Sequence, residues 1–508
     1  MTAEMVSPNI EQSESRGRLK SGPSPELIQS ANQLEIGYAP ILYKGLSLAD
    51  LAHVVMLTEA GVIPRDAAQK LLATLLTVHE IPVEKFVFDP ALGDAYKNRE
   101  RYITGLAPDV GGWLRTGRAR REATNIAYQI AVRERVLTLF EALADLAEAL
   151  MDLAEHHIET VMPDFTYLQH AQPTTLAHYL LAFVFPILRD FERLQACFRR
   201  VNMCSGGIGS VNGSRLAVNR KRLAELLGFD GLILHTRDAM WQADMPIEIM
   251  ADVVAAVINM DRLAEDLQIW VTQEFNLVEL ADGYCRESVI MPQKKNPYSL
   301  AFVRGAAGTL IGQLASMAVV GRTPSGQPDN RIFAYGDVPR SLDLAIQSAR
   351  LMAGVVRTLS VNTELMAYRA AEGYSQATDL AELIMLEAKI PYQEAHHLVG
   401  KVVSTAAGQG IPALRITSQM IDTVAVQTLG RAVNIPQEEL SRALQPQEIV
   451  ATRTGPGGAA PGAVKNMIDE ARSSIAAARF WKTQTETHLG EAESNLIELA
   501  GRIAGVAF

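Results

Sequence analysis

The chain has 508 residues, of which 48% are hydrophobic and 20% are charged, and its formal net charge is −10. This length can form several hydrophobic cores or one elongated assembly, while the acidic balance argues against a nucleic-acid partner held by general electrostatics. The three cysteines are too few and too scattered for a disulfide framework or a zinc site.

The apolar stretches of the chain are short. The stretch from Tyr179 to Leu188 is interrupted by Pro186, and we find no run long enough to span a bilayer. The N-terminal residues are rich in Ser, Glu and Pro and lack the apolar core of a signal peptide. We therefore expect a cytoplasmic, soluble protein with neither a membrane nor a nucleic-acid partner.

Helical periodicity dominates the chain after a polar N-terminal stretch. Residues 1–33 are rich in Ser and Pro and are expected to form a flexible arm. The run 121–157 carries leucines at alternating steps of four and three, which places an apolar stripe along one face of a helix roughly 50 Å long. The members of this stripe are Leu139, Leu143, Leu146, Leu150 and Leu153.

Further long helices are expected from proline and polar cap signals. Their ranges are 175–202, 246–275, 297–320 and 339–359. The alternating pattern of a half-buried strand is almost absent. Several helices longer than a small bundle can bury predict an all-α protein in which helices pack on helices, across subunits as well as within one.

The most informative motif is the segment 288–297, which reads Ser-Val-Ile-Met-Pro-Gln-Lys-Lys-Asn-Pro. It brings a hydroxyl, two lysines and an amide together just before a helix whose start is marked by Pro297. Such a loop binds anions, because the positive end of the helix points at it. Taken alone, either lysine is equally compatible with a basic surface loop, and Lys295 is expected to be solvent-facing or structural.

The whole segment resembles the signature loop of the argininosuccinate lyase branch of the fumarase/aspartase superfamily. Four more blocks of that branch follow in order, and the resemblance extends from about residue 46 to residue 464. The blocks are Thr-Gly-Arg-Ala-Arg at 116–120, Leu-Gln-His-Ala-Gln-Pro-Thr-Thr at 168–175, Ala-Thr-Asp-Leu-Ala at 377–381 and Glu-Ala-His-His-Leu-Val-Gly-Lys at 394–401.

The resemblance implies an all-helical fold of three domains. We expect an N-terminal domain at 34–120, a central long-helix domain at 121–370 and a C-terminal domain at 371–508, after the arm 1–33. It also implies a homotetramer with a central helical core, in which each active site takes its blocks from three subunits. Neither a metal nor an organic cofactor is implied.

By the same resemblance, Ser288 takes a proton from the carbon next to a carboxylate of a dicarboxylate substrate. Lys294 and Asn296 hold that carboxylate while negative charge builds on it. Arg120 and Arg121 suit a second carboxylate, since guanidinium groups bind carboxylates through two parallel hydrogen bonds. The remaining expected substrate contacts are Met291, Thr166, Gln172 and Gln327.

Several positions depart from the pattern of the branch. The branch protonates the leaving nitrogen with a histidine in a Thr-His-Leu-Gln motif, and a glutamate five residues after the signature asparagine holds that histidine. Here the two positions are Tyr167 and Ala301. Losing both together is physically consistent, because the carboxylate alone would be an unpaired buried charge. Tyr167 is compatible with a general acid and with a packing residue; His170 and His178 are alternative acids or structural histidines.

Other departures concern the leaving group. Arg121 replaces an asparagine, and the segments 235–244 and 325–331 replace sequences that face or contact the substrate in the branch. The sequence therefore keeps the half of the site that acidifies a carbon next to a carboxylate. The half that recognises the leaving group has been rebuilt.

Three functions remain open at this point. The first is a C–N lyase that eliminates fumarate from an N-substituted aspartate, either argininosuccinate or a related aminocarboxylic acid. The second is a lyase of the same fold whose leaving group needs little protonation. The third is a non-catalytic structural relative, as in the lens crystallins that resemble these lyases; the retained Ser288 argues against it.

Overall fold

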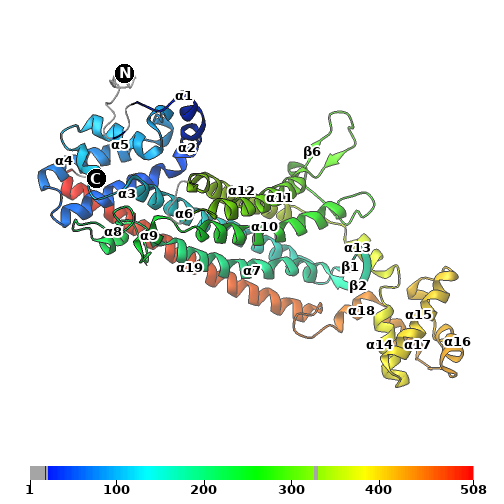
Figure 1. Ribbon diagram of the computed structural model, residues 1–508. Helices are drawn as coiled ribbons and strands as arrows, with labels where there is room; N and C mark the ends of the chain where they lie inside the picture. Colours follow the sequence, from blue (N-terminus) through cyan, green and yellow to red (C-terminus); the bar gives the residue numbers. More distant parts are fainter. Residues whose placement is uncertain (1–17, 19–20, 325–329, 507–508) are drawn as a thin grey trace.

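The computed structural model describes residue 18 and residues 21–324 and 330–506. Over these residues the chain forms an elongated bundle of long helices with a smaller helical unit at each end (Figure 1). The helices of the bundle are α6 (Arg120–His156), α7 (Leu176–Val201), α10 (Asp244–Trp270), α11 (Tyr298–Gly321) and α12 (Arg331–Arg357). The predicted all-α class is confirmed. Gln327, an expected substrate contact, lies outside the described residues.

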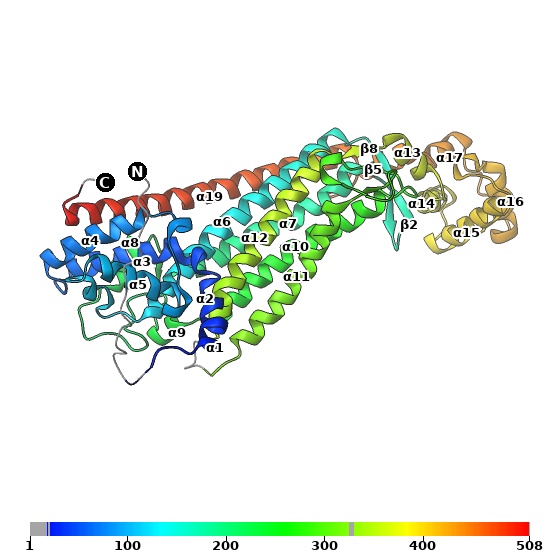
Figure 2. The same cartoon turned by 90° about the horizontal axis from the view of Figure 1, so that it is seen from above.

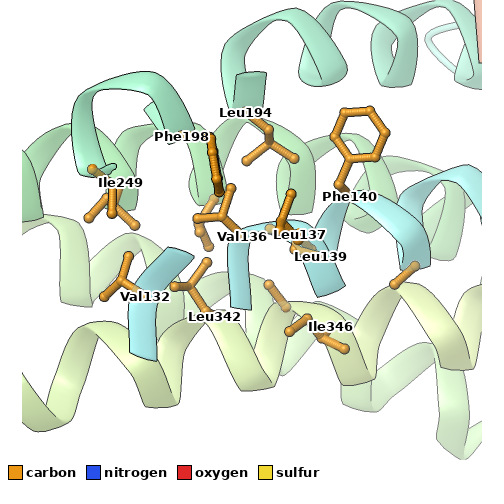
Figure 3. Close-up of a cluster of buried hydrophobic side chains, with 14 of the residues drawn as sticks. Val132, Val136, Leu137, Leu139, Phe140, Leu194, Phe198, Ile249, Leu342 and Ile346 are labelled. Atoms are coloured by element: carbon orange, nitrogen blue, oxygen red, sulfur yellow. The ribbon is translucent and has the colours of Figure 1, made fainter. Parts of the chain in front are cut away.

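The core of the bundle forms around α6, which packs against α7 and α12. The leucine stripe predicted for α6 is buried as expected, with Leu153 half-buried at its end. Figure 3 shows how the core is shared: α6 contributes apolar side chains that meet others from α7, α10 and α12. Those labelled there include Val136, Phe140, Leu194, Phe198, Ile249, Leu342 and Ile346. Each such side chain contributes roughly 1.5–3 kcal/mol by leaving water.

The N-terminal unit covers the end of the bundle at which α6 begins. Its helices are α3 (Ala39–Glu59), α4 (Arg65–His79), α5 (Ala95–Leu106), α8 (Arg220–Leu226) and α9 (Thr236–Met240). The described part of the expected flexible arm differs from the prediction. It forms α1 (Pro25–Leu27), a π-helical turn (Ile28–Asn32) and α2 (Gln33–Ile36), because the Asn32 amide donates to the Pro90 carbonyl at 2.9 Å and docks the segment.

The C-terminal unit has an apolar core of its own. Its helices are α14 (Ala377–Ala388), α15 (Tyr392–Gly408), α16 (Ser418–Leu429) and α17 (Gln437–Ala443), and α13 (Thr363–Ala371) and α18 (Pro446–Ala451) connect it to the bundle. The last helix, α19 (Pro461–Ala504), falls within the expected range 371–508 but leaves this unit. It runs back along the bundle and packs against α4, α6 and α7 (Figure 2).

The described residues also contain four pairs of short strands that the sequence did not predict, since most are too short to show alternation. The antiparallel pairs are β1 (Val161–Thr166) with β2 (Gln169–Thr175), β5 (Val278–Glu279) with β8 (Ser360–Val361), and β6 (Arg286–Glu287) with β7 (Lys295–Asn296). The parallel pair is β3 (Met203–Cys204) with β4 (Gly231–Leu232).

Proline proved an imperfect guide to helix starts. The range expected to begin at Pro339 begins at Arg331, and Pro339 lies buried inside α12. The residues before it are helical because Ala334, Tyr335 and Val338 pack into the bundle. Pro297 is the cap residue immediately before α11 and not its first helical residue.

Two helices correct the expectation that no apolar run is long enough to cross a bilayer. By length and composition alone, α3 and α11 both qualify. The most apolar stretch of α3 is 83% buried inside the protein, as in a core helix, whereas that of α11 is 28% buried. Exposed apolar side chains on α11 include Ile311 and Val319.

Candidate active site

The signature segment forms the tip of a hairpin that projects from one end of the bundle, where β6 is labelled in Figure 1. Its base is held by the β6–β7 pairing, in which Arg286 lies opposite Asn296. The Asn296 side-chain amide donates to the Arg286 carbonyl at 3.0 Å. The Arg286 guanidinium lies 3.4 Å from the centre of the Tyr298 ring, at the start of α11. The hairpin is thus fixed at its base, and its tip is left exposed.

Within the tip, Ser288 is held by the backbone. The Met291 N–H donates to Ser288 Oγ at 3.1 Å, and the Lys294 N–H donates to the Met291 carbonyl at 3.0 Å. A donor aimed at a hydroxyl oxygen favours its ionised form. The loop therefore gives Ser288 one of the interactions that a serine needs to act as a base.

The two adjacent lysines have different surroundings. Lys295 Nζ lies 2.7 Å from Asp282 Oδ1 and 2.9 Å from Glu279 Oε1. Its hydrogen bonds to Asp282 and then Glu279 raise its pKa. Lys294 makes no side-chain hydrogen bond or ion pair with the residues that the structure describes. The structural role expected for Lys295 agrees with this arrangement, and the Lys294 ammonium remains open to an anion.

A second hairpin, β1–β2, leaves the same end of the bundle and carries Thr166, Tyr167 and Gln172. Its two turn residues, Tyr167 and Leu168, have φ of +54° and +58°. Glycine and asparagine are preferred in such a turn, and each bulky residue there costs about 1–3 kcal/mol. The Tyr167 side chain is 99% exposed. Within this chain it packs against nothing substantial, and the strained turn presents it outward.

The root of the β1–β2 hairpin is anchored by aromatic packing. The Phe165 ring lies 5.4 Å from His170, 6.0 Å from Phe275 and 6.5 Å from Trp270, measured between ring centres. His178 has partners on both ring nitrogens, Thr174 Oγ1 and the Gly457 carbonyl, each at 3.0 Å. His178 thus behaves as a structural histidine.

Arg120 and Arg121 lie at the opposite end of the bundle, at the first turn of α6. The next residue, Glu122, is buried and accepts backbone N–H groups from Ala119 and Ile208 at 2.8 Å each and from Ser210 at 3.0 Å. This carboxylate fixes the helix start and the loop that follows β3. Arg120 Nη1 lies 3.0 Å from Asp94 Oδ2.

A third arginine, Arg331, joins this end and was missed by sequence reasoning. Its side chain is 1% exposed. Its Nη1 donates to the Met240 carbonyl at 2.5 Å, and its guanidinium carbon lies 5.9 Å from the ring centres of Trp241 and Tyr335. An arginine within an apolar run was the only available signal. We call Arg331 together with Tyr38, Tyr128, Trp241 and Tyr335 the Arg331 cluster.

The charges at this end are close enough to influence one another. Burial, followed by the Arg331 and Arg120 charges, lowers the pKa of Arg121. Burial lowers the pKa of Arg331. Burial and Asp94 raise the pKa of Glu35, which disfavours its ionised form. The arginines are thus incompletely balanced by acids.

The three departures at leaving-group positions converge here. Arg121 replaces an asparagine, Met240 and Trp241 belong to the altered segment 235–244, and Arg331 closes the altered segment 325–331. They come from α6, the end of α9 and α12, and they meet around one guanidinium. The rebuilt half of the site is therefore one spatial unit.

The signature loop and the arginine end are far apart within one chain. The 24-residue helix α11 runs from the signature hairpin to the end at which α12 begins, a length of roughly 36 Å. The structure thus brings Arg120 and Arg121 together with Arg331, but it does not bring them to Ser288. Ala301, at the position of the missing glutamate, is exposed on the first turns of α11.

Two cavities lie elsewhere. One of about 470 Å³ is lined by Glu394, His397 and Arg431 in the C-terminal unit, and one of about 310 Å³ lies between α8 and α19. Neither is lined by an expected site residue. In the described part of the chain, no group of three or more His, Cys, Asp or Glu side chains is arranged to hold a metal ion.

Comparison with known proteins agrees with this arrangement. Residues 51–312 match the family described as Lyase, and residues 374–451 match the family described as Argininosuccinate lyase C-terminal. The chain is 36% identical to argininosuccinate lyase from Methanosarcina acetivorans, over 94% of each chain. It is 32% identical to argininosuccinate lyase from Methanothermobacter thermautotrophicus, over 91% of this chain and 99% of the relative.

Two solved structures are similar over almost the whole length. EDDS lyase in complex with formate superposes with a TM-score of 0.86 at 31% identity, covering 98% of this chain and 99% of the other. An EDDS lyase variant with bound fumarate gives the same TM-score and identity, over 96% and 97% of the two chains. The chain belongs to the argininosuccinate lyase branch of the fumarase/aspartase superfamily and is a carbon–nitrogen lyase.

Proposed function

We propose that this lyase releases fumarate from an N-substituted aspartate, either argininosuccinate or a related aminocarboxylic acid. The observation that carries the proposal is the signature loop, in which a backbone N–H holds Ser288 Oγ and the Lys294 ammonium is left unpaired by the described residues. The similarity to a lyase structure with bound fumarate supports the product.

In the proposed mechanism the Ser288 alkoxide removes a proton from the carbon next to one substrate carboxylate. The electrons of the C–H bond move onto that carboxylate, which becomes enediolate-like, and Lys294 and Asn296 stabilise the added charge. One hydrogen of the Asn296 amide is used by the Arg286 carbonyl, and the other remains for substrate. The electrons then form the carbon–carbon double bond as the C–N bond breaks.

The departing nitrogen takes the electron pair of the broken bond and needs a proton if it is strongly basic. Tyr167 is our candidate donor, because a phenol can act as a general acid and this one is presented on an exposed, strained turn. A leaving group of low basicity would need no donor. The paired replacements at Tyr167 and Ala301 keep that second reaction class in view.

We further propose a homotetramer whose active sites combine different copies of the chain. The apolar surface of α11 supports this, since its stretch is only 28% buried. Gly305, Gly308 and Gly312 leave open space on this helix, which allows another helix to approach closely. The roughly 36 Å length of α11 also requires that the signature loop of one copy meet the arginine end of another. The expected cytoplasmic location is part of the same proposal.

The test is fumarate formation from a panel of N-substituted aspartates, followed by ultraviolet absorbance. We expect at least one compound to release fumarate and Ser288→Ala to lower its kcat by roughly 10²- to 10⁴-fold. Val289→Ala, at the exposed neighbouring residue, is the matched control and should change kcat little. Absence of fumarate from every compound would refute the proposed function.

A further inference from the structure

The Arg331 guanidinium has an empty hydrogen-bonding edge inside the protein. Nη1 is occupied by the Met240 carbonyl, but Nε and Nη2 are buried and have no partner. These two nitrogens lie on the same side of the planar group and present two parallel N–H bonds. A buried donor without an acceptor costs roughly 1–3 kcal/mol, and more when it is charged.

Elsewhere in the molecule the same edge binds a carboxylate. Arg115 Nε and Nη2 donate to the two oxygens of Glu100 at 2.9 and 2.6 Å. Arg222 uses the same two atoms for Glu59 at 2.9 and 3.1 Å. The geometry that these two surface arginines satisfy with a side chain is therefore unsatisfied at the buried Arg331.

Burial alone does not explain the vacancy. Arg133 is also buried and has no carboxylate partner among the described residues, yet its Nη1 and Nη2 donate to Asn202 Oδ1 and the Leu227 carbonyl at 2.9 Å each. Neutral acceptors from the protein thus suffice for a purely structural arginine. Arg331 receives one such acceptor and keeps a whole edge free.

The surroundings of Arg331 add donors and positive charge. The buried Tyr38 and Tyr128 hydroxyls also lack partners, and their rings lie 6.2 and 5.4 Å from Tyr335. Tyr335 itself donates to Asn125 Oδ1 at 2.5 Å. Arg120 and Arg121, which are partly exposed, place further positive charge beside the cluster. The aromatic walls favour a planar group lying in the plane of the guanidinium.

We propose that the Arg331 cluster binds a carboxylate on the leaving amine, so that the substrate is an N-substituted aspartate whose amine portion is itself an amino acid. This inference rests on the proposed function and narrows its substrate class. The carboxylate accepts two parallel hydrogen bonds from Arg331 Nε and Nη2. Arg331 thereby acts as a specificity-determining residue at the end of the site remote from the proton abstraction.

The experiment uses the reverse reaction, the addition of amines to fumarate by the full-length enzyme. The amines are pairs that differ only by a carboxylate: glycine and methylamine, β-alanine and ethylamine, 2,3-diaminopropionate and ethylenediamine, arginine and agmatine. In every productive pair we expect the carboxylated amine to have a kcat/KM at least about tenfold higher, because a site built around a hydrogen-bonded group rejects the analogue that lacks it. Loss of fumarate absorbance reports the rate.

Variants then assign the preference to Arg331. Arg331→Met should raise the KM for the carboxylated amine about tenfold or more and leave the rate with its decarboxylated partner within about threefold, and Arg331→Lys should restore part of the preference. Arg350→Met, at an exposed position of the same helix, is the matched control. Circular dichroism shows whether each variant is folded.

The possible results separate this inference from the proposed function. Equal or better rates with the decarboxylated amines, measured on the unaltered enzyme, would overturn the inference and leave the proposed lyase reaction standing. A preference that survives in folded Arg331→Met would also overturn it. Failure of every amine to add, together with no fumarate from any N-substituted aspartate, would contradict the lyase reaction itself.

Discussion

The two ends of the bundle solve different problems. At the signature end the functional groups are exposed, and the backbone arranges them: a hairpin base, a backbone N–H on Ser288 Oγ and a strained turn under Tyr167. At the arginine end the functional groups are buried, and side chains from α6, α9 and α12 arrange them. The comparison indicates that the proton-abstracting half is built locally, whereas the recognition half depends on tertiary packing.

The largest expected effect concerns the two adjacent lysines of the signature loop. Lys294→Met should lower kcat roughly 10²- to 10³-fold, because it removes a charge that stabilises the intermediate. Lys295→Met should change kcat much less, since it removes only exposed ion pairs with Glu279 and Asp282, each worth about 0–1 kcal/mol. Steady-state kinetics of the pair gives the answer, and equal losses would show that the two lysines are not differentiated as the loop geometry implies.

A second prediction concerns the bundle that joins the two ends. Burial raises the pKa of Asp190 on α7 to about 6, against the opposing charge of Arg193. The folded state therefore binds the proton more tightly than the unfolded state, in which the pKa is near 3.8. Stability should fall as pH rises from about 4 to 6, by roughly 3 kcal/mol at most.

Thermal unfolding across this pH range measures the effect. Asp190→Asn should flatten the dependence without changing which amines react. The neighbouring Asp252, whose pKa is also raised to about 6 by burial and then by Glu248, is the second contributor. A melting temperature that rises between pH 4 and 6 in the unaltered enzyme, and that Asp190→Asn does not alter, would contradict this assignment.

Tyr167→Phe tests the exposed end in a smaller way. It removes the phenol and keeps the ring, so kcat should fall about 10- to 100-fold for strongly basic leaving amines and less for weakly basic ones. Comparing the rates for two substrates that differ in amine pKa checks this. An undiminished rate for the more basic amine would remove Tyr167 as the proton donor.

The smallest expected effect separates strain from chemistry in the same turn. Leu168 has φ of +58°, and Leu168→Gly should stabilise the hairpin by about 1 kcal/mol because glycine adopts this conformation without strain. The rate should change little if Tyr167 keeps its position. Denaturant unfolding measures the change, and an unchanged or lower stability would mean that the turn is not strained in solution.

The sequence predicted the helices of the bundle well, because an apolar stripe such as Leu139 to Leu150 is a local pattern. It also predicted the signature end, where ten consecutive residues contain the chemistry. It could not place α19 along the bundle, since nothing local in residues 461–504 says which unit they cover. Arg331 was missed for the same reason: its burial and its empty edge depend on Met240 and Trp241, which are remote in sequence.

The most direct test of the account is whether Ser288 and Arg331 of different copies form one active site. Ser288→Ala and Arg331→Met chains, each impaired with a carboxylated amine, are unfolded, mixed in equal amounts and refolded together. The account predicts a rate well above the sum of the two variants refolded separately, because some sites then combine an intact signature loop with an intact Arg331. A mixture that shows only the average of the two, although light scattering confirms that tetramers formed, would contradict it.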